Sequence, residues 1–438
     1  MSLIQLGFWA ASGSAAALSY WLATLGSDSQ DYGNSVATDS DGNSYVVGET
    51  PSGEGGDNFF IAKYNFVGEV QWQRTLGGSA DDVGLAVALD SSANVYVSGY
   101  TRSEGAGSHD FLLAKYNSAG TIQWQRMLGG TLVDNANSVI VDSSGNSYIV
   151  GDTASTASGY RDLILAKYDS SGTLVFQRSL GAPSDHDNGQ AVKLDSAGNV
   201  YAFGSTKGTG TGRLNSLLVK YNDTGTLQWQ RVLGGDGNQY GNALAIDSSD
   251  NIYSFGDTTS EGAGGADFLV VKYNTSGGVE WQRILGGTSG EVGLGVAVDS
   301  LGNVYGAGWT LSEGEGNPDI VIAKWNSSGT IQWQRILGAP GTDVANSIAI
   351  DSLDNLYVFG YTNSTGAGGN DLLLAKLPAD GSLTGTYVLD SVDFVYAAST
   401  LTAATSTLTA ATPSLTAATS SLTDASASFT SHFVEIPT

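Results

Sequence analysis

The chain has 438 residues, and its 60 glycines together with only 14% charged residues set it apart from an ordinary helical enzyme and favour a fold rich in strands and turns. Its 18 basic residues against 43 acidic ones give a formal net charge of −25, so the phosphates of nucleic acids and anionic membranes would repel it, and we expect no nucleic-acid partner. It has no cysteine and three histidines, which excludes disulfides, thiolate zinc sites and cysteine nucleophiles, and we expect no cofactor.

Residues 1–19 form a short apolar leader before the repeated part of the chain. No basic residue precedes the apolar stretch, which makes the leader a poor secretory signal, and the chain has no run of about 18 apolar residues that would suggest a membrane span. The opening residues 1–13, MSLIQLGFWAASG, resemble the start of structural proteins of marine phages, in which a short apolar leader precedes appendage domains. The resemblance implies docking to a virus particle, with Leu6, Phe8 and Trp9 as the candidate contacts.

A repeat of about 52 residues fills the chain from residue 20 to residue 389. An aromatic residue, a lysine and an asparagine keep this step independently of one another. A period near 50 made of short strands is typical of propeller blades, and seven units lie within the usual range. The aromatic markers are Trp21, Trp72, Trp124, Phe176, Trp229, Trp281 and Trp333, the lysines are Lys63, Lys115, Lys167, Lys220, Lys272, Lys324 and Lys376, and the asparagines are Asn43, Asn94, Asn146, Asn199, Asn251, Asn303 and Asn355.

Residues 83–128 show how one unit makes four strands. The first strand holds small apolar residues, as the crowded axis of a ring requires, and the third is apolar on both faces, as expected between neighbouring blades. Alternation in the fourth strand places Trp124 and Arg126 on the face that meets the next blade. The predicted fold is therefore all-β, a seven-bladed β-propeller of four-stranded blades over residues 20–389. In this unit the strands are predicted at 83–89 (a), 95–101 (b), 110–116 (c) and 122–128 (d).

Two additional strands, at residues 20–25 and 383–389, flank the seven units. One of them must complete the last blade. We expect the N-terminal strand to do so, because closure by the opposite terminus removes an exposed sheet edge.

The repeated units have the form D-S-x-G-N-x-Y-V-x-G-x-T, followed by D-F-L-L-A-K-Y-N-x-x-G-T-I-Q-W-Q-R-x-L-G-G. They resemble the bacterial β-propeller repeat family known as SBBP over residues 20–389. That resemblance implies the propeller fold and, for function, extracellular or surface proteins without common catalytic residues. The G-T-x-x-W piece also resembles quinoprotein blades, although the eight blades and cofactor pocket usual in quinoproteins are not indicated.

An aspartate followed by serine opens the turn between strands a and b of every unit. Such an aspartate accepts hydrogen bonds from the backbone of its own turn, and seven copies suit a turn anchor better than an active site. A calcium loop starting at Asp39 would need glutamate where Thr50 stands, so we expect no metal. We expect the strand c lysines to reach a carboxylate or carbonyl, and the strand d arginines to stack on tryptophan. The turn aspartates are Asp39, Asp90, Asp142, Asp195, Asp247, Asp299 and Asp351.

The end of strand b is the position at which the units differ. Each unit has threonine there, and the residue before it changes, on the face of the ring that carries the b–c and d–a loops. On four consecutive blades these residues combine aromatic rings with a carboxylate, which suits a carbohydrate, while scattered surface aromatics without a ligand are the alternative. His109 and His186 lie in loops of this face, where solvated loops are favoured over a zinc site. The candidate ligand-binding residues are Glu49, Tyr100, Asp152, Asp257, Trp309 and Tyr361.

The tail, residues 390–438, has a period of seven. Apolar residues at this spacing suit the seam of a helical bundle, whereas the serine and threonine content and Pro413 disfavour a solvated helix. We expect the tail to order on partner subunits, as a trimeric stalk or as an extended arm, and the sequence leaves helix or extended chain open. A flexible low-complexity linker is the alternative. The candidate oligomerisation residues are Phe394, Leu401, Leu408, Leu415, Leu422 and Phe429.

These features predict a non-enzymatic structural or recognition protein. The hypothesis is a phage virion appendage, associated with a tail or fibre, whose propeller face binds a host-surface ligand such as a glycan and whose termini dock it or join copies into a homo-oligomer. A secreted bacterial surface adhesion or scaffolding propeller is the alternative. A propeller glycosidase or quinoprotein has less support, because no catalytic constellation stands out from the repeated acidic loops.

Overall fold

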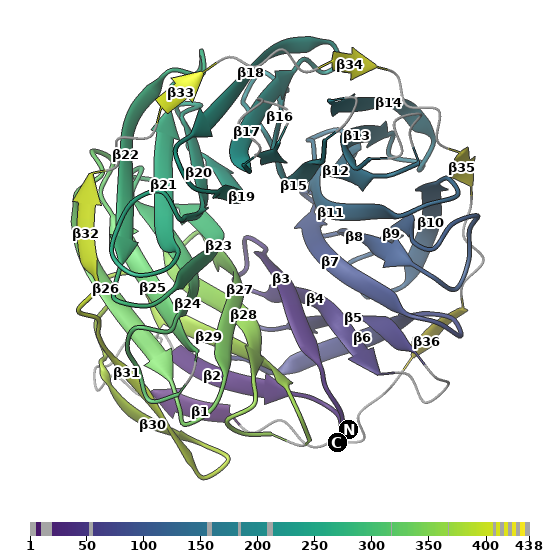
Figure 1. Ribbon diagram of the computed structural model, residues 1–438. Helices are drawn as coiled ribbons and strands as arrows, with labels where there is room; N and C mark the ends of the chain where they lie inside the picture. The colour runs from purple at the N-terminus through teal and green to yellow at the C-terminus, as the bar shows by residue number, and fades with distance from the viewer. Residues whose placement is uncertain are drawn as a thin grey trace.

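The computed structural model is a ring of seven β-sheets around a central axis (Figure 1). It describes residues 6–9, 20–51, 56–155, 160–182, 185–207, 213–316, 318–366, 368–405, 409–411, 416–418, 423–425 and 430–433. Each sheet contains a meander of four antiparallel strands, a to d from the axis outward, so the predicted seven-bladed propeller is confirmed. No helix long and apolar enough to cross a bilayer occurs in these described ranges.

The strands of the seven blades are as follows. Strands a are β3 (Tyr32–Thr38), β7 (Asp82–Leu89), β11 (Asp134–Val141), β15 (Asp187–Leu194), β19 (Gln239–Ile246), β23 (Glu291–Val298) and β27 (Asp343–Ile350). Strands b are β4 (Ser44–Pro51), β8 (Val95–Thr101), β12 (Ser147–Thr153), β16 (Val200–Thr206), β20 (Ile252–Thr258), β24 (Val304–Thr310) and β28 (Asn355–Thr362). Strands c are β5 (Asp57–Tyr64), β9 (Asp110–Tyr116), β13 (Asp162–Tyr168), β17 (Asn215–Tyr221), β21 (Asp267–Tyr273), β25 (Asp319–Trp325) and β29 (Asp371–Pro378). Strands d are β6 (Val70–Gly77), β10 (Ile122–Gly129), β14 (Leu174–Gly181), β18 (Leu227–Gly234), β22 (Val279–Gly286), β26 (Ile331–Gly338) and, for the seventh blade, β2 (Tyr20–Leu25).

The ring is closed by the N-terminal strand, as predicted. Strand β2 pairs antiparallel with β29 of the seventh blade, with Trp21 opposite Lys376. Outside it, β1 (Leu6–Trp9) adds one more strand to that blade. The other flanking strand, β30 (Gly385–Leu389), instead pairs with β31 (Val392–Ala398) at the outer edge of the sixth blade.

The hydrophobic core is divided into clusters that lie between neighbouring blades. In one of them Tyr45 and Ile61 of the first blade pack with Val97, Leu112 and Tyr116 of the second. Because both faces of strands b and c are covered in this way, the two-sided apolar pattern of these strands is satisfied.

The face of strand d that carries tryptophan and arginine contacts the next blade, as predicted. Trp72 Nε1 donates to Ser118 O at 3.1 Å, and Arg74 Nε donates to Gly120 O at 2.7 Å, both in the c–d turn of the second blade. The Arg74 guanidinium lies 5.5 Å from the centroid of the Trp72 ring. Gly120 has a φ of +75°, and the indole occupies the space that a Cβ atom would need, so glycine is required there. The same arginine-to-carbonyl bond is made by Arg126, Arg178, Arg231, Arg283 and Arg335.

The turns between strands a and b are held by their aspartates. Asp247 Oδ1 accepts hydrogen bonds from the backbone N–H groups of Ser249 and Asn251, both at 2.9 Å. Its Oδ2 accepts from Asn251 Nδ2 at 2.8 Å and from the Tyr253 hydroxyl at 2.9 Å. Asp39 makes the same set of bonds, so the aspartate of the first blade also serves its turn.

Six of the seven strand c lysines reach a carboxylate or a carbonyl, as predicted, and Lys63 lies over a tyrosine ring instead. Lys220 Nζ lies 3.1 Å from Asp195 Oδ2, and Lys167 Nζ donates to Asp223 O at 3.2 Å. Lys63 Nζ lies 5.0 Å from the centroid of the Tyr45 ring. Corresponding contacts to carboxylates or carbonyls are made by Lys115, Lys272, Lys324 and Lys376.

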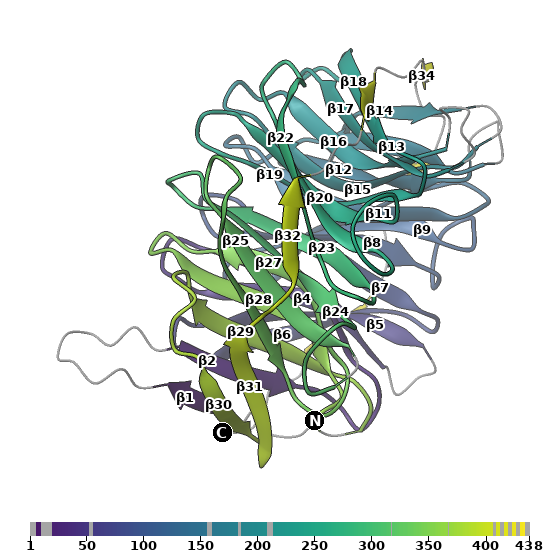
Figure 2. The same cartoon turned by 60° about the vertical axis from the view of Figure 1, so that its left-hand side comes forward.

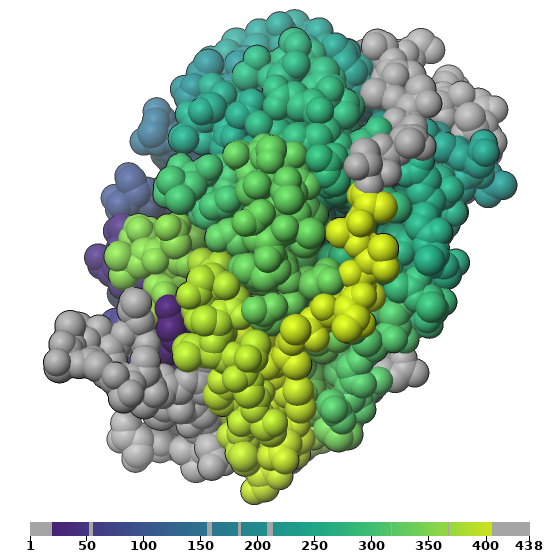
Figure 3. All heavy atoms as spheres, turned by 90° about the vertical axis from the view of Figure 1, so that its left-hand side faces the viewer, coloured from purple at the N-terminus to yellow at the C-terminus, as the bar shows by residue number. Residues whose placement is uncertain are grey.

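The described parts of the tail are extended, and they pair with this chain's own blades. The tail strands each lie outside a strand d, and successive strands reach successive blades in reverse order, from the sixth to the first (Figures 1 and 2). Strands β31 and β32, in yellow, lie on the outside of the ring in Figure 3. The remaining tail strands are β32 (Thr402–Thr405), β33 (Thr409–Ala411), β34 (Thr416–Ala418), β35 (Thr423–Ala425) and β36 (Thr430–Phe433).

The seven-residue period of the tail therefore corresponds to one blade per heptad. One alanine of each of five successive heptads stands opposite the same position of strand d in its blade; the pairs are Ala397 with Ile336, Ala404 with Ile284, Ala411 with Val232, Ala418 with Ser179 and Ala425 with Met127. Phe394 and Leu401 are buried against the chain's own blades. Leu408, Leu415, Leu422 and Phe429 lie outside the described residues, and association of copies through the tail stays a prediction.

Candidate functional site

The upper face of the propeller is the face that carries the b–c loops and the d–a turns. The structure places all six candidate residues at one equivalent position there, directly before the threonine near the end of strand b. Of these, Asp152 and Asp257 are buried. The half-buried members of the set are Glu49, Tyr100, Trp309 and Tyr361.

Asp152 and Asp257 hold the inner strands and do not face a ligand on the upper face. Asp152 is 2% exposed, accepts from Asn137 Nδ2 at 3.0 Å and pairs with Arg161 Nη1 at 2.8 Å. Asp257 is 4% exposed and accepts from Asn242 Nδ2 at 3.2 Å. Burial raises the pKa of Asp257 to about 7. The expectation that these two carboxylates are displayed on the face is therefore not met.

Glu49 differs from them in having no bonding partner. Within the part of the chain that the structure describes, its half-buried carboxylate makes neither a hydrogen bond nor an ion pair. Burial, together with the charges of Asp57 and Asp81, raises the pKa of Glu49 to about 7. Asp81 is itself paired with Arg102, 2.6 Å from Nη1. Glu49 is therefore a carboxyl group whose pKa is raised to about 7 and whose oxygens accept no hydrogen bond from any described residue.

Aromatic rings lie on both sides of Glu49. Tyr32 stands directly across from it in the β3–β4 pair, and the Tyr361 ring of the seventh blade meets the Tyr32 ring edge-on at 5.0 Å. On the second blade, Tyr100 stacks in parallel on His109 at 4.2 Å. Burial and then the nearby Glu49 carboxylate raise the pKa of Tyr100. We call these five residues the Glu49 cluster; it spans the seventh, first and second blades.

Trp309 is the fourth half-buried candidate. It stands between Val292 and Ile320 in the register of the sixth blade. Of the ring contacts between described residues, none joins Trp309 to Tyr361. The structure thus brings together Tyr361, Glu49 and Tyr100, and leaves Trp309 on the neighbouring blade outside the cluster.

Tyr32 was missed by the sequence prediction. It stands in strand a opposite the variable residue of strand b, and this position also varies between blades, although variation along strand b alone does not reveal it. His109 had been placed in a solvated loop; in the structure its Nδ1 lies 2.9 Å from Asn135 Oδ1, which fixes the ring against Tyr100. The equivalents of Tyr32 are Val83, Asn135, Asn188, Tyr240, Val292 and Val344.

A second set of buried carboxyl groups lies beneath the d–a turns and has a structural role. Asp82 Oδ2 accepts from the backbone N–H of Gly78 and from the Ser103 hydroxyl, both at 2.7 Å, and so fixes the turn that leads into strand a. Burial raises the pKa of Asp187 and of Asp319 to about 6. Residues that accept the same turn bond are Asp31, Asp134, Asp187, Gln239, Glu291 and Asp343.

No group of three or more histidine, cysteine, aspartate or glutamate side chains is arranged to hold a metal ion among the residues with described positions. His186 Nδ1 accepts from the backbone N–H of Arg161 at 3.2 Å, and its ring meets Tyr160 edge-on at 5.4 Å. The two loop histidines therefore serve local contacts on different blades.

Comparison with known proteins agrees with this architecture. Residues 5–53, 123–156, 280–314 and 332–366 match the family model for SBBP, described as a beta-propeller repeat. The resemblance of the repeated units to SBBP is thus confirmed, and the molecule is a β-propeller that carries this repeat. The description names a repeat and no activity, and the resemblance of the leader to phage proteins stays a prediction.

Two curated proteins are similar to this chain at low identity. The regulatory protein FlaEY of Caulobacter vibrioides is 25% identical over 384 residues, which cover 72% of this chain and 40% of that protein. An uncharacterized WD repeat-containing protein of Acanthamoeba polyphaga mimivirus is 24% identical over 298 residues, which cover 64% of this chain and 18% of that protein. The chain therefore spans less than half the length of either relative.

Among solved structures, a subtype N11 neuraminidase-like protein of A/flat-faced bat/Peru aligns with 80% of this chain and 89% of its own. The TM-score is 0.37 and the sequence identity is 11%. A likeness at this level carries no argument about the function of this chain.

Proposed function

We propose that the protein is a non-enzymatic recognition propeller that binds a glycan at the Glu49 cluster. The observation that carries this proposal is the Glu49 carboxylate, which has no bonding partner in the described structure and is flanked by aromatic rings from three consecutive blades. Sugar rings stack their apolar faces on aromatic side chains, and their hydroxyl groups donate to carboxylates. Both requirements are met at this one part of the upper face.

Recognition is favoured over catalysis because of the surroundings of Glu49. A glycosidase places two carboxyl groups on either side of the scissile bond, one as acid and one as base or nucleophile. Next to Glu49, Asp81 is held by Arg102, which leaves Asp57, whose pKa is raised by burial and by the charge of Asp81. A glutamate that titrates near neutral pH could also act as a general acid, so the experiment must separate binding from turnover.

The test is a glycan array probed with the wild-type protein, Tyr361→Ala, Glu49→Gln and Tyr240→Ala. Tyr240 occupies the position of Tyr32 on the fifth blade, opposite the buried Asp257, and serves as the matched control. We expect Tyr361→Ala and Glu49→Gln to lose at least about tenfold in affinity, or about 1.4 kcal/mol, while Tyr240→Ala retains wild-type binding. No glycan bound by the wild type, or equal binding by all four proteins, would contradict the proposal. Turnover of a polysaccharide that Glu49→Gln abolishes would replace recognition by catalysis.

The setting we propose is a virion appendage, docked through the leader residues Leu6, Phe8 and Trp9, which form β1 at the outer edge of the seventh blade. Support comes from the resemblance of the leader to phage structural proteins. A protein inventory of purified particles tests it, because a structural component must be present in the particles. Detection only in the medium or on the bacterial surface would favour the secreted adhesion protein.

Homo-oligomerisation through the tail belongs to the same proposal. Light scattering of the full chain and of a chain ending at residue 389 gives the mass with and without the tail strands. A multimeric mass that becomes monomeric on truncation supports association through the tail. A monomeric full-length chain would limit the tail to pairing with its own blades.

A further inference from the structure

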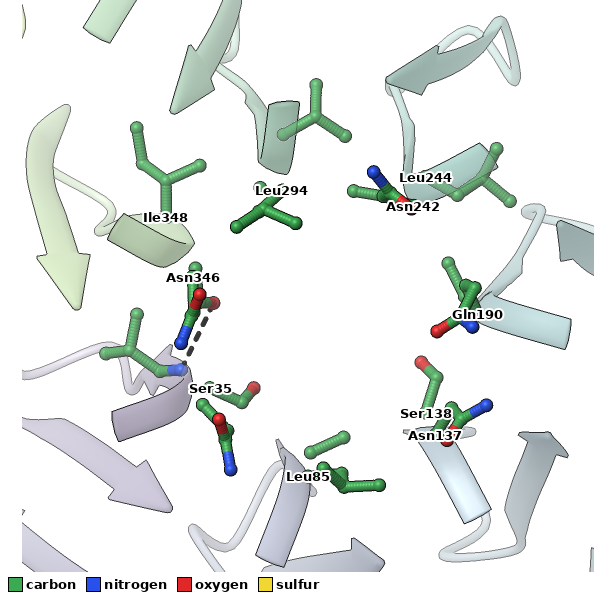
Figure 4. A pocket seen from close by; sticks show the side chains of 18 of the residues that line it. Ser35, Leu85, Asn137, Ser138, Gln190, Asn242, Leu244, Leu294, Asn346 and Ile348 are labelled. Atoms are coloured by element: carbon green, nitrogen blue, oxygen red, sulfur yellow. Dashed lines mark hydrogen bonds between the residues drawn. The ribbon is translucent and has the colours of Figure 1, made fainter. Parts of the chain in front are cut away.

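The central channel is a second site, separate from the upper face. The seven strands a line two overlapping cavities along the axis, an upper one of about 360 Å³ and a lower one of about 510 Å³ (Figure 4 shows the upper one). Both volumes lie in the range of roughly 300–1,000 Å³ that small-molecule sites occupy.

The upper cavity is lined by amide groups because every strand a has a β-bulge. The register shift inserts one additional residue, and these residues lie around the opening in Figure 4 where they are labelled. Four of these residues are asparagines, and each donates its Nδ2 to a carbonyl of the next blade at 2.8 Å. Gln190 makes no side-chain hydrogen bond to any described residue, so its amide is available to a ligand. The bulge residues are Asn34, Leu85, Asn137, Gln190, Asn242, Leu294 and Asn346.

The described residues that line the lower cavity are aliphatic apart from Thr38 and Lys193. Lys193 on β15 lines both cavities and is the one charged residue among the described residues that line them. Each of the other six blades has a residue at the position of Lys193 in strand a, and five of these six residues are alanine. The residues at these positions are Ala37, Ala88, Ile140, Ala245, Ala297 and Ala349.

Lys193 has no counter-charge in the channel. No aspartate or glutamate is among the described lining residues, and Nζ makes neither a hydrogen bond nor an ion pair with the described part of the chain. The enclosing walls lower the pKa of its ammonium group. A cation that is partly removed from water without a partner is unfavourable, and an anion that enters the channel would relieve that cost. The chain as a whole carries a net charge of −25, so most of its surface repels anions. Lys193 is unusual because no carboxylate is among the described residues that line the channel beside it.

We propose that the channel binds a small aliphatic monocarboxylate, with its carboxylate at Lys193 Nζ and the Gln190 amide and its alkyl chain in the lower cavity. One unpaired ammonium group matches one negative charge. The walls below it are aliphatic side chains, among them Leu89, Ile246 and Ile350, which an alkyl chain can contact.

Sodium octanoate is the probe, and its affinity is measured by calorimetry, with octan-1-ol and sodium acetate as comparison ligands. We expect the wild type to bind octanoate at least about tenfold more tightly than octanol, which lacks the charge, and than acetate, which lacks the chain. Equal affinity for octanoate and octanol, equal affinity for octanoate and acetate, or no binding of octanoate at millimolar concentration would overturn the proposal.

Two alanine variants with the same change in net charge locate the site. Lys193→Ala restores the residue found in most other blades, so the fold should be kept, and we expect octanoate affinity to fall at least about tenfold. Lys207→Ala removes a lysine of the same blade from the b–c loop, outside the channel, and should bind octanoate like the wild type. Unchanged affinity in Lys193→Ala would contradict the site. Glycan binding at the Glu49 cluster should be the same in both variants, so the two proposals fail independently.

Discussion

The two ends of the fifth blade carry aspartates with opposite properties. On the lower turn, Asp247 accepts four hydrogen bonds, and these hold its pKa below the usual value even though burial acts to raise it. On the upper face, Asp257 accepts one bond from Asn242, and burial raises its pKa to about 7. The lower turn is repeated around the ring with its bonds complete, whereas the upper position changes from blade to blade. Both residues are aspartates, so the residue type does not distinguish a turn anchor from a carboxylate at a variable position. The number of hydrogen bonds that the carboxylate accepts does distinguish them.

The largest effect on stability is expected from a deletion that opens the ring, because the upper and lower faces of the propeller both depend on a closed ring. Deletion of residues 1–25 removes β1 and β2 and uncovers the buried Leu372 and Leu374 of β29. We expect this variant to lack a cooperative unfolding transition and to aggregate, as judged by circular dichroism and size-exclusion chromatography, because an exposed apolar edge strand associates. Deletion of residues 1–9 keeps β2 and should unfold cooperatively. A normal transition in the longer deletion would contradict closure by β2.

Asp247→Ala tests the lower end of the comparison. It leaves the N–H groups of Ser249 and Asn251 and the Tyr253 hydroxyl without their acceptor, and we expect a loss of about 2–4 kcal/mol in the free energy of unfolding. Guanidinium unfolding measures this loss. Asp247→Asn keeps one acceptor oxygen and should lose less. A loss below about 0.5 kcal/mol, typical of surface substitutions, would show that the turn bonds contribute little.

The pH dependence of stability tests the upper end. An acid whose pKa is raised in the folded state stabilises the fold most when it is protonated. Its contribution to the free energy of unfolding is therefore complete below about pH 4 and is lost as the pH rises through about 6 to 7. We therefore expect the unfolding free energy to fall between about pH 4 and pH 7 and these groups to add little further change at higher pH. The groups that carry this effect are Glu49, Asp187, Asp257, Asp267 and Asp319.

Asp257→Asn isolates one member of this set. The amide oxygen can still accept from Asn242 and carries no charge, so we expect a gain of about 1–3 kcal/mol at pH 8 and little change at pH 4. Denaturant unfolding at the two pH values measures the difference. A variant that is less stable than the wild type at pH 8 would show that the aspartate is needed as an anion.

Glu49→Gln should have the smallest effect on stability. The side chain is half-buried, so solvent screens its charge, and we expect a gain of less than about 1 kcal/mol at pH 8. The same variant should lose glycan binding. A stability loss as large as that of Asp247→Ala would indicate that Glu49 has a structural bond and is not free for a ligand.

The site was predictable in part. Comparing equivalent positions of strand b found Glu49, Tyr100 and Tyr361, because an exception within a repeat needs no structure to be seen. The same comparison selected Asp152 and Asp257, which turned out to be buried. Alternation along a strand shows on which face of its sheet a side chain lies. It does not show that Asn137 and Asn242, which stand at bulges in strand a, donate hydrogen bonds to these carboxylates. Nothing in the residue pattern indicates a bulge.

The tail shows the same limit for the fold. Its period of seven was visible, and it fits both a helical seam and an extended chain that reaches one blade per repeat. The outer strands d decide between these two conformations. Each four-stranded blade leaves the outer edge of its strand d without a partner, and the tail pairs with these edges in turn through Ala404, Ala411 and Ala418.

The sequence by itself determined the number of blades, their four strands and the turn anchors, because these depend on periodicity and on contacts repeated in every unit. Only the tertiary structure decided which terminal strand closes the ring, which carboxylates have their bonds completed, where the tail lies and that Lys193 is the one charged residue among the described residues that line the channel. These properties depend on neighbours contributed by other blades, and burial, pKa and hydrogen bonding are set by such neighbours rather than by the local sequence.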